Sequence, residues 1–159
     1  MNLTQAAMAL LPLIHPAAPK QPDAPMIAQS AAQAVELDTF PPITGTKVGD
    51  VALMLQTAWG ESTMSATKHG ACVTGDHGRA LGVWQLQNTP EVIACSVAPA
   101  AREWLRMAHY SLHKCATLQP DARLAGLFSG NCEHGLAISR YRLYLAHRAE
   151  IAFTQHLKV

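Results

Sequence analysis

The chain has few charges, and they nearly balance. Charged residues make up 14% of its 159 residues, and 12 Lys and Arg against 11 Asp and Glu give a formal net charge of +1. It contains no run of Lys or Arg of the kind that follows a phosphate backbone. Without a basic stripe or an overall positive field, nucleic acid is not expected as a partner.

Several catalytic signatures are also missing. The chain has no P-loop, no G-x-G-x-x-G dinucleotide motif and no G-x-S-x-G turn of a serine hydrolase. No C-x-x-C pair occurs, which argues against a zinc ribbon or a thioredoxin-like site. His109 and His113 are four residues apart, but no third ligand lies at a familiar spacing. We therefore expect neither a metal nor another cofactor.

Long apolar runs are absent from the N-terminal region. The first residues, MNLTQAAMALLPLIHPAA, are interrupted by Pro12 and Pro16 and have no Lys or Arg before the apolar stretch. This pattern is a poor secretory signal and is too short for a membrane span. The Pro- and Ala-rich segment that follows is typical of an extended linker. We expect residues 1–45 to form a flexible or loosely docked arm that can include a short helix between Met26 and Leu37, with an atypical export segment as the alternative. We expect residues 46–159 to form one domain.

Four cysteines lie in this second region: Cys72, Cys95, Cys115 and Cys132. The favoured interpretation is two disulfides formed in an oxidising compartment. Three pairings are possible, and the order along the chain suggests Cys72 with Cys95 and Cys115 with Cys132. The alternative is four reduced, buried thiols in a cytosolic protein.

A helix over residues 47–60 is the central structural prediction. Its apolar residues recur at i, i+3, i+7 and i+10, as Val48, Val51, Leu55 and Ala58. Thr46 can cap its first turn, Asp50 favours its positive end, and Glu61 falls beside the buried stripe. A carboxylate held there against Trp59 is partly desolvated, which would raise its pKa as a general acid requires. The alternative is a solvated Glu just after a helix.

The remainder of the domain also has helical patterns. We expect helices over residues 99–117, 120–129 and 133–157, with residues 81–87 as a short strand or an irregular segment. The core stripe of the first comprises Ala101, Leu105, Ala108, Leu112 and Cys115, and that of the last comprises Ile138, Tyr141, Leu145, Ala149 and Ala152. Arg140, Arg142 and Arg148 are interpreted mainly as a solvated face.

Three motifs occur in a recognisable order. Glu61-Ser62 ends an apolar helix, Gly82-Val83-Trp84-Gln85 is a G-x-x-Q segment, and residues 124–132, LAGLFSGNC, form a small-residue turn before the last helix. Over about residues 47 to 150 this order resembles the lysozyme-like lytic transglycosylases, in the goose-type lysozyme superfamily, which cleave bacterial peptidoglycan. The family usually has a Tyr-Asn pair in the third motif, and this chain lacks it.

The resemblance implies an all-α, lysozyme-like fold around a central catalytic helix. It also implies that Glu61 cleaves the β-1,4 bond between N-acetylmuramic acid and N-acetylglucosamine, first as acid and then as base, to leave a 1,6-anhydro end. Gln85 would orient the N-acetyl group, and Ser62 would support Glu61 or a sugar. Asn131 and Tyr141 are further candidates for contacts with the glycan, although Tyr141 and Tyr144 can equally be packing residues.

Other functions remain open at this point. Asp76 is either a turn former or a second carboxylate that orients water, as in a lysozyme-type muramidase. The domain can also be a catalytically silent glycan-binding or assembly module, or a helical protein unrelated to sugars. The expected location is the periplasm, the cell exterior or a virion, in a secretion, conjugation or phage assembly or in wall recycling.

Overall fold

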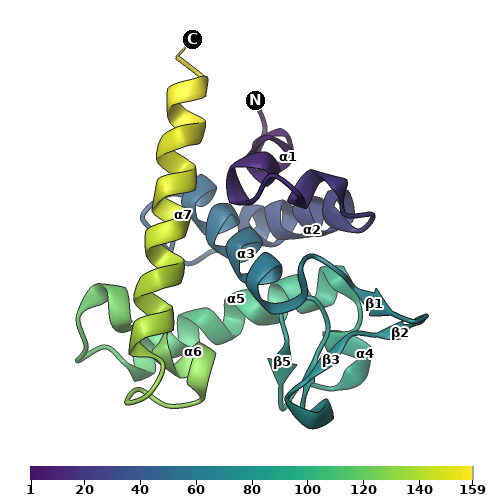
Figure 1. Cartoon of the computed structure of the whole chain (residues 1–159). Coiled ribbons are helices and arrows are strands. Elements are labelled where there is room, and N and C mark those ends of the chain that lie inside the picture. The colour runs from purple at the N-terminus through teal and green to yellow at the C-terminus, as the bar shows by residue number, and fades with distance from the viewer. Residues whose placement is uncertain (159) are drawn as a thin grey trace.

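The computed structural model describes residues 1–158, most of which are helical (Figure 1). The longer helices are α1 (Leu3–Ile14), α2 (Ala24–Leu37), α3 (Lys47–Ser62), α5 (Val97–Lys114) and α7 (Leu136–His156). Two helices are short, α4 (Glu91–Ala94) and α6 (Ala125–Ser129), and three 3-10 turns are present, η1 (Ala18–Lys20), η2 (Asp76–Gly78) and η3 (Pro120–Ala122). None of these described helices is long and apolar enough to cross a membrane.

Two small antiparallel sheets correct the expectation of an all-α fold. Strands β1 (Thr67–Lys68) and β2 (Ala71–Cys72) form a hairpin. Strands β3 (Thr74–Gly75), β4 (Ala80–Leu81) and β5 (Leu86–Gln87) form a second sheet in that order. Each strand has only two residues, which is too short for a period-2 pattern to show in the sequence. The fold is therefore mainly helical, with a small β region between α3 and α4.

Helix α3 lies at the centre of the molecule. Every residue from 49 to 58 is buried, because α1 and α2 pack on one side of the helix and α7 on the other (Figure 1). Thr46 caps the helix as predicted, and its side chain accepts from the backbone N–H of Gly49 at 2.9 Å. A helix that is buried all round explains why so few of its residues are charged.

The expectation of a flexible or loosely docked arm over residues 1–45 is wrong, because α1 and α2 are formed there and pack into the core. Helix α2 includes the short helix expected between Met26 and Leu37. The buried residues of the two helices include Ala7, Leu10, Leu11, Ile27, Ala28 and Ala31, all in the same hydrophobic cluster as α3. Alanine side chains let helices approach closely, so an Ala-rich segment that looks like a linker can form a tight helix pair. After α1, the ring of His15 stacks on Trp59 of α3 with centroids 4.2 Å apart.

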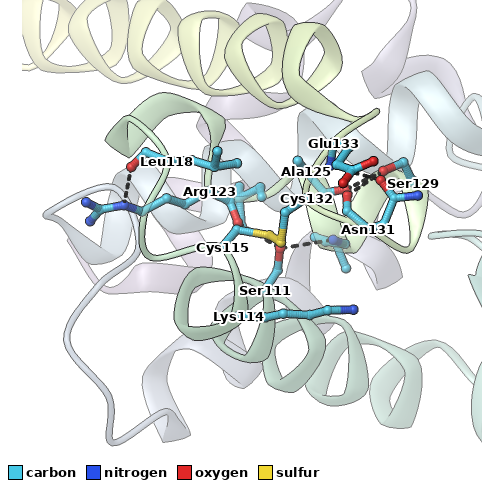
Figure 2. Close-up of a disulfide and its surroundings, with 12 residues drawn as sticks. Ser111, Lys114, Cys115, Leu118, Arg123, Ala125, Ser129, Asn131, Cys132 and Glu133 are labelled. Atoms are coloured by element: carbon cyan, nitrogen blue, oxygen red, sulfur yellow. Dashed lines mark hydrogen bonds between the residues drawn. A yellow bond between two sulfur atoms is a disulfide. The ribbon is translucent and has the colours of Figure 1, made fainter.

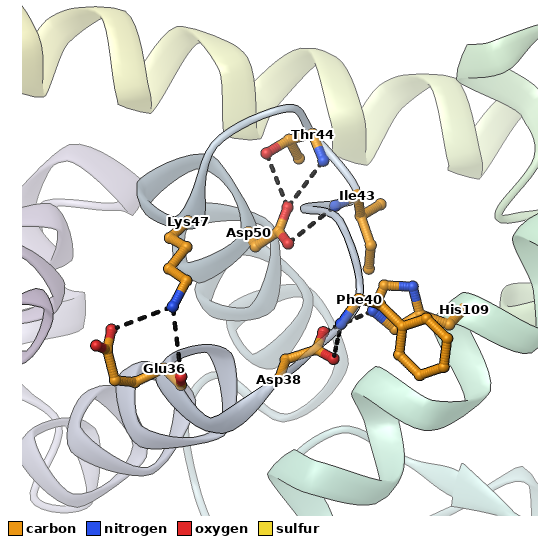
Figure 3. Close-up of polar contacts among 8 residues, drawn as sticks. All are labelled: Glu36, Asp38, Phe40, Ile43, Thr44, Lys47, Asp50 and His109. Carbon is orange, nitrogen blue, oxygen red and sulfur yellow. Dashed lines mark hydrogen bonds and ion pairs between the residues drawn. The ribbon is translucent and has the colours of Figure 1, made fainter.

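Polar contacts fix the segment between α2 and α3 (Figure 3). Asp50 accepts from the backbone N–H groups of Ile43 and Thr44 at 2.9 and 2.8 Å, and also from the Thr44 hydroxyl. Burial raises the pKa of Asp50, and the hydrogen bonds from Thr44 and Ile43 oppose this effect. Asp38 pairs with Nε2 of His109 at 2.6 Å. His109 thus serves a structural contact, and no group of three metal-ligating side chains is found among residues 1–158.

Both expected disulfides are present. Cys72 of β2 is bonded to Cys95 at the end of α4, and Cys115 at the end of α5 is bonded to Cys132 after α6 (Figure 2). The first bridge ties the β region to the helical body. The second ties the turn after α6 to α5.

Candidate active site

A cleft of about 300 Å³ separates the β region from α6. Glu61 of α3 and Gln85 of the G-x-x-Q segment both line it, and Ser129 and Gly130 line it from the α6 turn. Its wall also includes Asp76, Trp84, Trp104 and Phe128. The three motifs singled out in the sequence therefore surround a single cleft, whose volume and mixed polar and aromatic wall are typical of a small-ligand site.

Glu61 lies in the last turn of α3, with 27% of its side chain exposed. Its Oε1 accepts a hydrogen bond from Nη2 of Arg142 at 2.7 Å. This partner comes from α7 and was not anticipated from the sequence. The carboxylate thus faces the cleft while a buried guanidinium holds it from behind, which stabilises negative charge on Glu61.

Arg142 is buried, so its interpretation as part of a solvated face is wrong. Its Nη1 donates to the carbonyl oxygen of Thr57 at 3.0 Å, and its guanidinium carbon lies 5.2 Å from the centre of the Phe128 ring. On the other side, a Cβ added to Gly60 would lie 2.8 Å from Nη2. Burial lowers the pKa of Arg142, while the charge of Glu61 and its hydrogen bond oppose this effect. The guanidinium is therefore held between Gly60 and Phe128.

One sequence signal could have placed Arg142 inside. The buried residues of α7 are Ser139, Arg142, Ala146, Ala149 and Phe153, which recur at three- and four-residue steps. This stripe is offset from the one expected, so Tyr141 is exposed and Arg142 is buried. An Arg at a position within such a stripe of small residues is expected to be buried, provided that a carboxylate is available to pair with it.

The G-x-x-Q segment forms a tight turn on the other side of the cleft. Gly82 has φ of +76°, and a Cβ there would overlap the carbonyl oxygen of Ala94. The backbone N–H and the side-chain Nε2 of Gln85 both donate to the carbonyl oxygen of Gly82, at 3.1 and 2.9 Å, and these two bonds close the turn. Its Oε1 lies against Gly75, where any Cβ would collide with it. Gly75 thus leaves room for the Gln85 amide at the cleft wall, and Gly82 lets the turn approach the backbone of Ala94.

Asp76 lines the same cleft as Glu61. Its Oδ1 accepts from Nη2 of Arg79 at 3.0 Å and its Oδ2 from Nε2 of Gln87 at 3.2 Å. With 42% of its side chain exposed, it remains accessible to water. Asp76 is therefore both a turn residue and a second carboxylate in the cleft.

The remaining candidates do not line the cleft. Ser62 donates to the Ala58 carbonyl oxygen at 3.0 Å, within its own helix. The side chain of Asn131 accepts from the backbone N–H groups of Glu133 and His134, so it stabilises the turn before α7. Tyr141 is 61% exposed on α7. Tyr144 is also exposed, with Arg148 over its ring. The third motif thus contributes residues 126–130 to the cleft wall, but not Asn131.

Two buried serines hold the α6 wall of the cleft in place. Ser111 donates to the carbonyl oxygen of Arg123 at 2.7 Å and accepts from the N–H of Leu127 at 3.0 Å (Figure 2). Ser139 makes the equivalent contacts from α7, because its hydroxyl donates to the backbone carbonyl oxygen of Asp121 at 2.7 Å and accepts from the backbone N–H of Leu124 at 3.2 Å. Together with the Cys115–Cys132 bridge, these bonds fix the wall that faces Glu61.

No protein-family model, curated protein or solved structure matches this chain. Its functional interpretation therefore depends on the chemistry of the cleft and on the motifs that surround it.

Proposed function

We propose that the chain is a peptidoglycan lytic transglycosylase with a lysozyme-like fold. One observation carries the proposal: Glu61, at the end of a buried helix, lines the same cleft as Gln85 and the Ser129–Gly130 turn. A carboxylate between aromatic walls and an amide donor is suited to a sugar whose glycosidic oxygen must be protonated. A cleft that is open to solvent can also accept a polymer.

The chemistry needs one carboxylate. Protonated Glu61 gives its proton to the oxygen that links N-acetylmuramic acid to N-acetylglucosamine, and the bond from that oxygen to C1 of the muramic sugar breaks. The N-acetyl group of the same sugar stabilises the positive charge at C1, and Gln85 orients this group. Ionised Glu61 then removes the proton of the 6-hydroxyl, whose oxygen attacks C1. A 1,6-anhydro end results, and Glu61 is protonated again.

Arg142 has a defined part in this cycle. It pairs with ionised Glu61, which is the form that acts as base in the second half of the reaction. It also fixes the direction of the carboxylate, since its own position is set by Gly60, Thr57 and Phe128. We therefore assign Arg142 as a positioning residue for Glu61.

Digestion of purified sacculi by the wild type and by Glu61→Gln tests the proposal. We expect the wild type to release soluble fragments with 1,6-anhydro ends, identified by mass spectrometry, and the variant to be slower by roughly 100-fold or more. Glu91→Gln, an exposed Glu in α4, is the matched control and should act like the wild type. An active Glu61→Gln variant, or an inactive wild type, would refute the proposal.

Two alternatives each have an observation in their favour. Because Asp76 lines the cleft with Glu61, a muramidase that activates water is the second candidate. It would leave reducing ends, and Asp76→Asn would abolish them. Because Glu61 is paired with a buried Arg142, a silent glycan-binding module is the third, and it would bind sacculi without releasing fragments.

The place of action follows from the same proposal. Two disulfides fit an oxidising compartment, and the proposed substrate lies outside the cytoplasmic membrane. We therefore place the protein in the periplasm, at the cell exterior or on a virion. A secretion, conjugation or phage assembly that must cross the wall is the corresponding kind of partner.

A further inference from the structure

A second hollow of about 380 Å³ adjoins the cleft. The two share wall residues from both sides, including Gln87 and Asn88 of the β region and Leu127 and Gly130 of the α6 turn. They are therefore parts of one groove. Beyond the shared wall, the second hollow is bounded by α5, with Arg106, Tyr110 and Lys114.

The charges of this second hollow are unevenly paired. Arg106 donates to both carboxylate oxygens of Glu103, at 2.6 and 2.9 Å, so its charge is locally neutralised. Lys114 is exposed, and its Nζ donates only a long hydrogen bond of 3.4 Å to the carbonyl oxygen of Gly130. It forms no ion pair with any residue from 1 to 158. Since Gly130 lines both hollows, Lys114 is a cation at their junction, near Ser111 in Figure 2.

The other groups of the hollow suit a peptide. Tyr110 is 61% exposed and lies one helical turn before Lys114 on the same face of α5. Its ring can cover an apolar side chain while its hydroxyl stays in water. Asn88 and Thr89 offer an amide and a hydroxyl that can bind peptide groups. An uncharged sugar can only accept a hydrogen bond from this ammonium, whereas a peptide carboxylate also pairs with its charge.

We propose that the second hollow binds the peptide stem carried by the glycan, and that Lys114 pairs with a carboxylate of that stem. This inference rests on the proposed function, because it assigns the neighbouring cleft to the sugar chain. Lys114 would then favour wall material that still carries its peptides over glycan with neutral substituents.

Binding by the full-length chain carrying Glu61→Gln tests this, since that variant leaves the ligand intact. The probes are soluble glycan oligomers with native peptide stems and the same oligomers with their stem carboxylates converted to amides. We expect tighter binding of the native form by about 2- to 5-fold, the range for a partly exposed ion pair. Lys114→Gln should remove this preference, Lys114→Arg should keep it, and Lys20→Gln, at an exposed lysine of η1, should leave it unchanged.

The outcomes separate this inference from the proposed function. Binding of both probes with equal affinity, or a preference that survives Lys114→Gln, would overturn the role of the second hollow and leave the glycan proposal standing. Failure to bind either probe, together with an inactive wild type on sacculi, would overturn both. A preference that is lost in Lys114→Gln and weakens with added salt would support the inference.

Discussion

Glu61 and Arg142 join the last turn of α3 to α7 through a 2.7 Å hydrogen bond between residues 81 positions apart. The arginine is buried and the carboxylate faces the cleft. The same contact therefore serves the stability of the helix pair and the orientation of the proposed catalytic group. Substitutions of the two residues can measure how much this contact contributes to the free energy of unfolding, separately from its effect on activity.

Substituting both partners of this pair should lower the free energy of unfolding by less than the sum of the two single substitutions. Arg142→Met or Glu61→Gln alone leaves a buried or partly buried group without its partner, and we expect each to lower the free energy of unfolding by about 2 kcal/mol or more. In the double variant the costs should not add, with a coupling of at least about 1 kcal/mol. Urea unfolding of the four proteins measures this cycle. Additive costs would show that the pair contributes nothing.

The effect of Gly60→Ala on the free energy of unfolding should have opposite signs in the presence and in the absence of the Arg142 side chain. In the wild type the new Cβ would crowd the Arg142 guanidinium, so we expect a loss of about 1–3 kcal/mol in unfolding free energy. In an Arg142→Ala background the space is empty, and the higher helix propensity of alanine should stabilise α3 by up to about 1 kcal/mol. A similar loss in both backgrounds would mean that the guanidinium does not pack on Gly60. Thermal unfolding of the two pairs is the measurement.

Gly82→Ala and Gly70→Ala form a matched pair. Both positions have φ close to +80°, but Gly70 is surrounded by open space whereas a Cβ at Gly82 would overlap the Ala94 carbonyl oxygen. We expect about 1 kcal/mol of destabilisation at Gly70, from the backbone conformation alone. At Gly82 we expect several kcal/mol of destabilisation and loss of the proposed glycan binding, because the turn that carries Gln85 must move. Equal effects in denaturant unfolding would refute this account of the motif.

The raised pKa of Asp50 should make the stability of the protein depend on pH. Burial raises its pKa in the folded protein above the ordinary value of 3.8. The folded protein therefore binds a proton at Asp50 more tightly than the unfolded chain does. The resulting stabilisation is fully present below about pH 3.8 and is lost as the pH rises through the pKa of Asp50 in the folded protein. Relative to Asp50→Asn, the wild type should become less stable over that interval and then level off. Urea unfolding from pH 3 to 7 measures the difference.

Glu133→Gln, in an exposed residue before α7, is the control for this titration and should show no such trend. If the wild type instead became more stable relative to Asp50→Asn as the pH rises, the pKa of Asp50 would be lowered in the folded protein. In that case the three hydrogen bonds from Ile43 and Thr44 would outweigh burial.

Local patterns were sufficient to predict much of the helical body and both disulfides. The helix expected over residues 47–60 is α3, that over 99–117 corresponds to α5, and that over 133–157 to α7. Glu61 and Gln85 were assigned to the same reaction from the motifs, and both residues line one cleft. These features depend on periodicity, capping and motif order, which a single sequence carries.

The errors concern features that only tertiary contacts determine. The N-terminal helices are rich in alanine, Pro12 lies inside α1, and the burial of both helices depends on contacts with α3. The two-residue strands are defined by cross-strand bonds and not by a local pattern. The burial of Arg142 requires a carboxylate from the other half of the chain, and Asn131 is diverted to its own turn.

The two ends of the chain both reach α3, since α1 packs on α3 and on α7. Glu61 is made early in synthesis, but the arginine that secures it belongs to the last helix. A nascent chain that has not yet produced α7 would expose the apolar flank of α3 and leave its carboxylate unsecured. We therefore expect the cleft to form only after α7 has been synthesised, so that a product truncated before α7 lacks a formed cleft.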